Sequence, residues 1–117
     1  MREILFRGKT ILGEWVYGDL EHNGKNTPKW VDGKEIIPET IGQFTGLTDK
    51  NGKKIFEGDI LKGSKVRDMM IVVFSQSGCF IVVSCGGWWD FIDNIGEIEV
   101  IGNIIDNKEL LDIGEKV

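Results

Sequence analysis

Residues that build metal centres and cross-links are scarce here: the 117 residues include two cysteines, two prolines and one histidine. Structural zinc sites usually take four Cys or His ligands, and the chain has neither CxxC nor HxxxH spacing. On one strand, Cys79 and Cys85 would lie roughly 20 Å apart, whereas a disulfide needs Cα atoms within about 7 Å. Unless the chain folds back between them, we expect two buried free thiols, no metal ion and no cofactor. His22 beside Asn23-Gly24 is predicted to be an exposed turn residue.

Long apolar runs are also missing. No stretch of about 18 apolar residues is present, so we expect no membrane span. Charged residues interrupt the N-terminal sequence Met1-Arg2-Glu3-Ile4-Leu5-Phe6-Arg7, which is unlike a secretory signal peptide. These absences predict a cytoplasmic protein.

Motifs of the common enzyme classes are absent. The chain contains no G-x-S-x-G elbow and no G-x-x-x-x-G-K-[ST] phosphate loop. The acidic residues Asp90, Asp93, Glu97 and Glu99 lack the spacing of an EF-hand. A divalent-metal enzyme built on Asp90, Asp93 and Glu97 is the least favoured of three functions considered, and we expect a protein without catalytic residues.

Glycine is abundant, with 16 residues spread along the chain. Frequent turns and the lack of a sustained 3.6-residue apolar period predict a mainly β fold. We expect small barrel-like or sandwich sheets of short antiparallel strands, with at most a short C-terminal helical turn. The length predicts one domain over residues 1–117, with two sub-barrels over roughly 1–60 and 61–117 as a variant. Strands are predicted at residues 3–7, 14–20, 30–31, 35–37, 54–62, 69–74, 79–83 and 97–105.

Several boundaries have specific signals. Asn23-Gly24 and Asp32-Gly33 predict tight hairpin turns, because Asn, Asp and Gly tolerate positive φ. Pro38 is expected to end the strand before it. The strands at 69–74 and 79–83 are apolar on both faces, so both faces are expected to be covered.

Charge is unevenly distributed. Residues 71–117 hold two basic and eight acidic residues, whereas residues 47–70 hold six basic and four acidic ones. Phosphate neutralisation supplies most non-specific nucleic-acid affinity, so this middle segment is the candidate for nucleic-acid contact. Its cations are Lys50, Lys53, Lys54, Lys62, Lys65 and Arg67.

The neighbouring residues Trp88 and Trp89 are a candidate interface. Successive strand residues point to opposite faces, so an extended segment would send one indole into the core and the other out of it. An outward tryptophan is favoured at protein interfaces and can also stack on a nucleobase.

Several segments together resemble the YopX family of bacteriophage and prophage proteins. They are Arg2-Glu3-Ile4, Phe6-Arg7-Gly8-Lys9, Trp15-Val16-Tyr17-Gly18-Asp19-Leu20, the span Pro38 to Leu47, Asp49-Lys50-Asn51-Gly52-Lys53, Ile55-Phe56-Glu57-Gly58-Asp59-Ile60-Leu61 and Glu99-Val100-Ile101-Gly102-Asn103-Ile104-Ile105. The resemblance implies a predominantly β, oligomeric protein of a bacterial host cell. The family is generally described as uncharacterised, so no catalytic residue is carried over.

Two functions follow as hypotheses. The leading one is a non-enzymatic phage accessory protein that forms a homo-oligomer and acts through a protein partner. The alternative is a nucleic-acid-binding β module that uses the basic segment 47–70.

Overall fold

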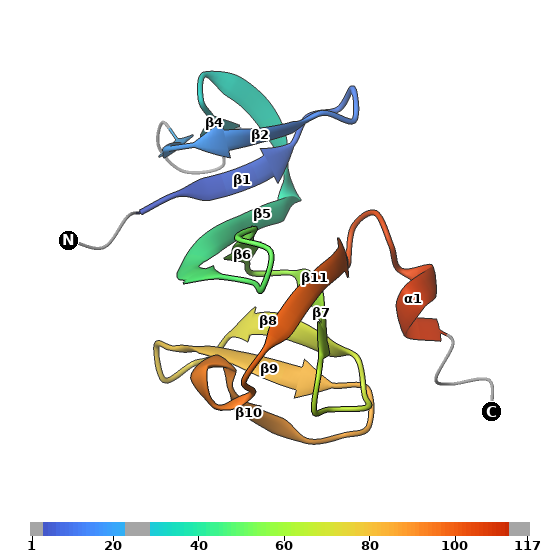
Figure 1. Ribbon diagram of the computed structural model, residues 1–117. Coiled ribbons are helices and arrows are strands. Elements are labelled where there is room, and N and C mark those ends of the chain that lie inside the picture. Colours follow the sequence, from blue (N-terminus) through green and yellow to red (C-terminus); the bar gives the residue numbers. More distant parts are fainter. Residues whose placement is uncertain (1–3, 23–28, 113–117) are drawn as a thin grey trace. The chain divides into compact units, whose positions relative to one another are not determined.

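The computed structural model describes residues 4–22 and 29–112, which form two compact units, Met1–Gly46 and Leu47–Val117 (Figure 1). The described chain is built mainly of short antiparallel strands in two sheets. Its helical content is limited to the 3₁₀ turn η1 (Ile92–Asn94) and the short helix α1 (Glu109–Asp112). The predicted mainly β fold is thus confirmed. The sequence predicted one domain over residues 1–117, with two sub-barrels divided near residue 60 as a variant, whereas the contacts form two units that divide between Gly46 and Leu47.

The first unit contains one twisted sheet in the order β2-β1-β5-β4-β3. Val16, Val31 and Ile36 form its buried core. Asp32 and Gly33 have φ angles of 51° and 74°, so the predicted Asp-Gly hairpin turn is confirmed. The strands are β1 (Phe6–Lys9), β2 (Trp15–Gly18), β3 (Leu20–His22), β4 (Lys29–Val31) and β5 (Lys34–Thr48).

Strand β5 continues through Pro38, so the expected strand end there is wrong. The register of β1 against β5 explains the difference. Arg7 pairs with Gly42 and Lys9 pairs with Ile37, so β5 carries extra residues between these two pairs. Pro38 lies in this irregularity, where a missing N–H breaks no ladder hydrogen bond. The side chain of Thr40 takes the place of a backbone acceptor here, because its Oγ1 accepts a 2.8 Å hydrogen bond from the backbone N–H of Lys9.

The predicted strand over 14–20 is two strands, β2 and β3. Gly18 interrupts it with a φ of 154°, and a Cβ at this position would lie 3.1 Å from Cβ of Asp32. Glycine therefore permits a close approach that ends β2. The Asn23-Gly24 turn and the side chain of His22 lie outside the described residues.

The second unit contains a five-stranded sheet in the order β10-β9-β8-β7-β11. Strands β8 and β9 form the predicted hairpin, with Phe74 paired to Phe80 and Val72 to Val82. The predicted bend at Gly58 separates β6 from β7, and this glycine has a φ of 93°. The strands of this sheet are β7 (Asp59–Gly63), β8 (Met70–Phe74), β9 (Phe80–Ser84), β10 (Trp89–Phe91) and β11 (Ile98–Asn103), whereas β6 (Lys54–Phe56) pairs with β5.

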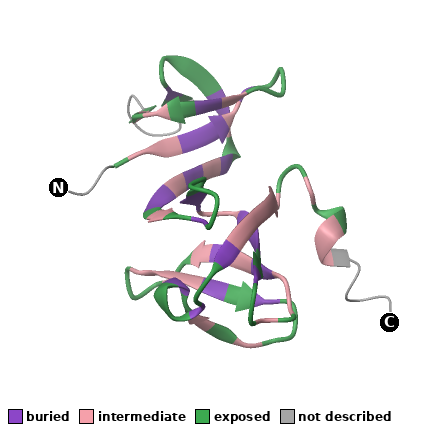
Figure 2. Ribbon diagram, in the orientation of Figure 1, coloured by how far each residue is buried: buried purple, intermediate pink, exposed green. Residues whose placement is uncertain are grey.

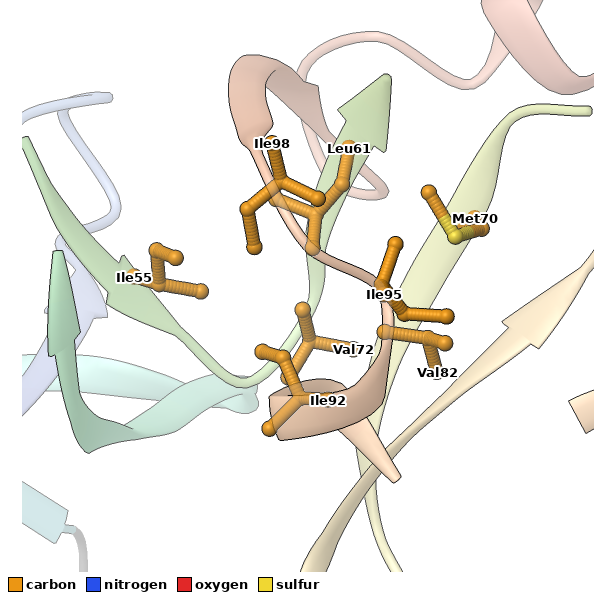
Figure 3. Close-up of a cluster of buried hydrophobic side chains, with 8 residues drawn as sticks. All are labelled: Ile55, Leu61, Met70, Val72, Val82, Ile92, Ile95 and Ile98. Carbon is orange, nitrogen blue, oxygen red and sulfur yellow. The ribbon is translucent and has the colours of Figure 1, made fainter. Parts of the chain in front are cut away.

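The core of the second unit lies against one face of this sheet (Figure 3). Its side chains come from several strands and from the segment around η1, namely Ile55, Leu61, Met70, Val72, Val82, Ile92, Ile95 and Ile98. Along β9, Val82 is fully buried and its neighbour Val83 is 37% exposed. The expectation that both faces of the β8–β9 hairpin are covered is therefore wrong for the outer face of β9.

Both cysteines are free thiols, but neither is buried. Cys79 is half-buried at the end of the β8–β9 turn, and Cys85 is exposed in the turn after β9. Both were expected to be buried because free cysteine usually packs as a small apolar residue. The turns at each end of β9 instead carry these residues outward.

Candidate functional site

The two neighbouring tryptophans diverge. Trp88 packs against the core of the second unit, and its Nε1 donates a 2.9 Å hydrogen bond to Oδ2 of Asp68. Trp89 begins β10 and is 59% exposed. The alternation predicted for this segment is confirmed, because successive residues entering a strand point to opposite sides.

Trp89 belongs to an exposed aromatic pair on the outer side of the sheet. Phe91 lies two residues along β10 and is 46% exposed. The two rings meet edge to face, with centroids 5.6 Å apart and planes at 85°. This geometry is favourable for aromatic pairs.

The pairing of β10 with β9 extends this pair into an apolar face. Trp89 lies opposite Val83 and Phe91 lies opposite Ile81. We refer to Ile81, Val83, Trp89 and Phe91 as the aromatic face. The mixture of exposed and half-buried segments along β9 and β10 can be followed in Figure 2.

A groove of about 510 Å³ runs over the aromatic face. The polar turn Ser75-Gln76-Ser77 lies at one end and Gly87 lies near the other. None of the residues that line the groove is charged; they are Ser75, Gln76, Ser77, Ile81, Val83, Gly87, Trp88, Trp89 and Phe91. An open apolar groove with a few polar groups is typical of a binding surface.

The polar end of the groove adjoins Cys79. Its Sγ lies 3.4 Å from Oγ of Ser75 and 3.5 Å from Oγ of Ser77. Hydrogen bonds from Ser75 and then Ser77 lower the pKa of the Cys79 thiol. The thiolate is thus more accessible at neutral pH than in an ordinary cysteine.

The six cations predicted to contact nucleic acid are all exposed. The structure pairs some of them with acids. Nζ of Lys50 lies 3.7 Å from Oε1 of Glu99, and Lys62 is the cross-strand neighbour of Glu99. Lys50 and Lys62 also line a small hollow of about 140 Å³ together with Glu97.

The remaining cations lie in different parts of the second unit. Lys53 lies in the turn after β5 and Lys54 begins β6, whereas Lys65 and Arg67 lie between β7 and β8. Exposed ion pairs contribute little stability, but they reduce the positive field that a phosphate backbone would meet. Nucleic-acid contact by these residues stays a prediction.

The acidic residues considered for a metal site do not form a ligand cluster. Over residues 4–22 and 29–112, no three His, Cys, Asp or Glu side chains are placed to hold one ion. Oδ1 of Asp90 instead accepts bonds from the backbone N–H of Phe91 at 2.8 Å and from Nδ2 of Asn94 at 3.0 Å. Asp90 therefore shapes the end of β10.

One exposed apolar feature was missed in the sequence. Ile11 and Leu12 form the tip of the hairpin turn between β1 and β2 and are 81% and 83% exposed. This turn is green in Figure 2. The signal was present as two large aliphatic residues directly before Gly13, where turns normally carry polar residues.

Comparison with known proteins gives a family match and structural matches. A family model described as YopX protein matches residues 7–112. A crystal structure of protein EF1440 from Enterococcus faecalis is similar, with a TM-score of 0.56 and 24% sequence identity over 95% of this chain and 99% of that one. None of the curated proteins matches the sequence. In the described residues, the helices are too short or too polar to cross a membrane.

Proposed function

The chain belongs to the YopX protein family, and we propose that it is a non-catalytic accessory protein that self-assembles through the aromatic face. Its setting would be a bacteriophage or prophage in the bacterial cytoplasm, where the assembly acts on a protein partner. The observation that carries the proposal is the exposure of Trp89 and Phe91 above an uncharged groove.

The surface is suited to a second copy of the chain. A charged lining would place like charges together when two identical faces or grooves meet, and this lining has no charge. Tryptophan and phenylalanine are enriched at the centres of protein interfaces, where they supply much of the binding energy.

The available area sets the expected strength. A fully buried aromatic side chain removes about 150–250 Å² from solvent. Trp89 is 59% exposed, Phe91 46% and Val83 37%, so the exposed parts of the three side chains together offer roughly 300 Å² of apolar surface. A standard interface buries about 800 Å² per partner, of which about 60% is apolar. The aromatic face provides more than half of that apolar area, which supports a weak and reversible association.

Sedimentation equilibrium across the micromolar range tests the proposal. We expect the mass of the wild-type protein to rise with concentration and Trp89→Ala to remain monomeric. Ile105→Ala is the matched control, because Ile105 is 37% exposed in the turn after β11 and lies outside the aromatic face. A wild-type protein that stays monomeric throughout would refute self-assembly.

The nucleic-acid alternative has its own test. Fluorescence anisotropy with labelled single-stranded and duplex DNA at two salt concentrations measures binding directly. The alternative predicts affinity that falls steeply with salt and weakens in a Lys53→Glu/Lys54→Glu variant. Absence of binding at low salt would refute the nucleic-acid alternative.

A further inference from the structure

The Ile11–Leu12 tip is the most exposed large apolar feature of the described chain. The next most exposed side chain of this kind is Ile4, at 64%. Contact of these two adjacent aliphatic side chains with water is unfavourable, and their exposure shows that little of their surface packs against the rest of the unit. A partner surface that covers them removes that contact with water.

The tip is held by backbone and side-chain hydrogen bonds. The N–H of Thr10 donates to the carbonyl of Glu14, and the N–H of Gly13 donates to the carbonyl of Thr10, both at 2.9 Å. Oγ1 of Thr10 also accepts a 3.2 Å bond from the N–H of Glu14. Gly13 takes a φ of 89°, which closes the turn. Such a preformed projection loses little conformational entropy on docking.

The groove over the aromatic face has the complementary properties. It is concave, mainly apolar and, at about 510 Å³, within the size range of ligand-binding pockets. Residues 71–96 contain no Lys, Arg or His and two acids, Asp90 and Asp93. The tip is flanked by one cation and one acid, Lys9 and Glu14, so it carries no net charge and meets no net repulsion from the acids beside the groove.

We propose that the Ile11–Leu12 tip of one copy inserts into the aromatic groove of a second copy. This inference rests on the proposed self-assembly and specifies its occupant. The contact joins two different surfaces, so each copy carries one tip and one groove. Contacts of this heterologous kind form closed rings or extended chains rather than a simple two-fold dimer.

Two variants separate the surfaces. The tip variant is Ile11→Ser/Leu12→Ser, and the groove variant is Trp89→Ala. All three side chains are more than half exposed, so neither variant removes core packing. Far-UV circular dichroism and thermal melting check the fold; if Trp89→Ala lowers the melting temperature, Phe91→Ser replaces it as the groove variant.

Sedimentation velocity is measured for each protein alone and for an equimolar mixture. We expect wild type and Ile105→Ala to associate beyond the dimer, and each variant alone to remain monomeric. The mixture should form a complex of one tip variant with one groove variant, because the first keeps its groove and the second keeps its tip. That complex cannot grow further.

The outcomes that overturn the inference differ from those that overturn self-assembly. If the tip variant associates like wild type while the groove variant does not, the face is an interface but the tip is not its occupant. A mixture that stays monomeric also overturns the tip-in-groove contact. A wild-type protein that never associates refutes both proposals.

Discussion

The carboxylate of Asp49 accepts a 2.9 Å hydrogen bond through Oδ2 from the backbone N–H of Val100, 51 positions further along the chain. Its Oδ1 accepts two more, from the N–H groups of Asn51 and Lys53, each at 2.9 Å. One buried side chain thus closes the turn after β5 and fastens it to β11. The N–H of Lys50 adds a 3.0 Å bond to the carbonyl of Ile98.

This arrangement covers one edge of the five-stranded sheet. Strand β11 is one edge and β10 is the other. At β10, the carboxylate of Asp90 accepts the N–H of Phe91. Aspartates therefore satisfy backbone donors at both edges, which discourages strand-to-strand association between copies. This favours contact through the face of the sheet.

Replacement of Asp49 by alanine should destabilise the second unit strongly. Three backbone N–H groups would lose their acceptor, and we expect a loss of about 2–4 kcal/mol in the free energy of unfolding. Urea denaturation measures this, with Asp93→Ala as the control because Asp93 is exposed. Equal midpoints for the two variants would show that the Asp49 bonds contribute nothing.

Stability should also fall in acid through Asp49. Burial raises the pKa of this carboxyl, but its three backbone hydrogen bonds and the charge of Lys53 outweigh burial and hold the pKa below its usual range. A carboxyl with a lowered folded-state pKa stabilises fully above its unfolded pKa of about 3.9 and loses this contribution as pH falls through the folded value. Denaturation midpoints between about pH 2 and pH 6 should therefore drop less for Asp49→Asn than for wild type. Parallel curves would contradict the assignment.

A methyl group at Gly102 should disturb the turn that follows β11. An added Cβ would lie 2.6 Å from Oδ1 of Asn107, the atom that accepts the N–H of Asn103 at 3.1 Å. We expect Gly102→Ala to cost about 1–3 kcal/mol by urea denaturation. In an Asn107→Ala background the added cost should shrink, because the obstructing oxygen is gone; strictly additive effects would show that the two residues do not interact.

Cys79 should alkylate faster than Cys85 at neutral pH. The hydroxyls of Ser75 and Ser77 lower the pKa of its thiol, which increases the thiolate fraction that reacts. Mass spectrometry of iodoacetamide labelling at several pH values gives both rates in one sample. In Ser75→Ala the rate profile of Cys79 should move to higher pH while that of Cys85 stays in place. Unchanged profiles for both thiols would refute the effect of the serine.

Features set by neighbouring residues were predictable from the sequence. The Asp32-Gly33 turn, the bend at Gly58 and the alternation of Trp88 and Trp89 each depend on a few adjacent positions. The path of β5 through Pro38 was not predictable, because it depends on the register of β1, a strand about 30 residues away. Local signals do not encode that register.

In the candidate site, too, features set by neighbouring residues were predictable and features set by tertiary pairing were not. The divergence of Trp88 and Trp89 was foreseen, but not which of them points outward. The neighbours of Trp89 were not foreseen either, since the pairing of β10 with β9 places Ile81 and Val83 beside it. Ile11 and Leu12 were overlooked because their exposure depends on the turn closing at Thr10. A residue pattern gives the direction of a side chain, whereas tertiary pairing decides what surrounds it.

Fluorine NMR on protein labelled with 5-fluorotryptophan would locate the self-association directly. The chain has four tryptophans, so four resonances can be assigned by single replacement with phenylalanine. Trp30, which is 36% exposed in the first unit and does not line the groove, is the internal control. Trp88 lines the groove beside Trp89, so its resonance is expected to respond as well. As concentration rises, we expect the Trp89 resonance to shift and broaden while that of Trp30 stays fixed. Resonances that all stay fixed, or a shift at Trp30 without one at Trp89, would contradict association through the aromatic face.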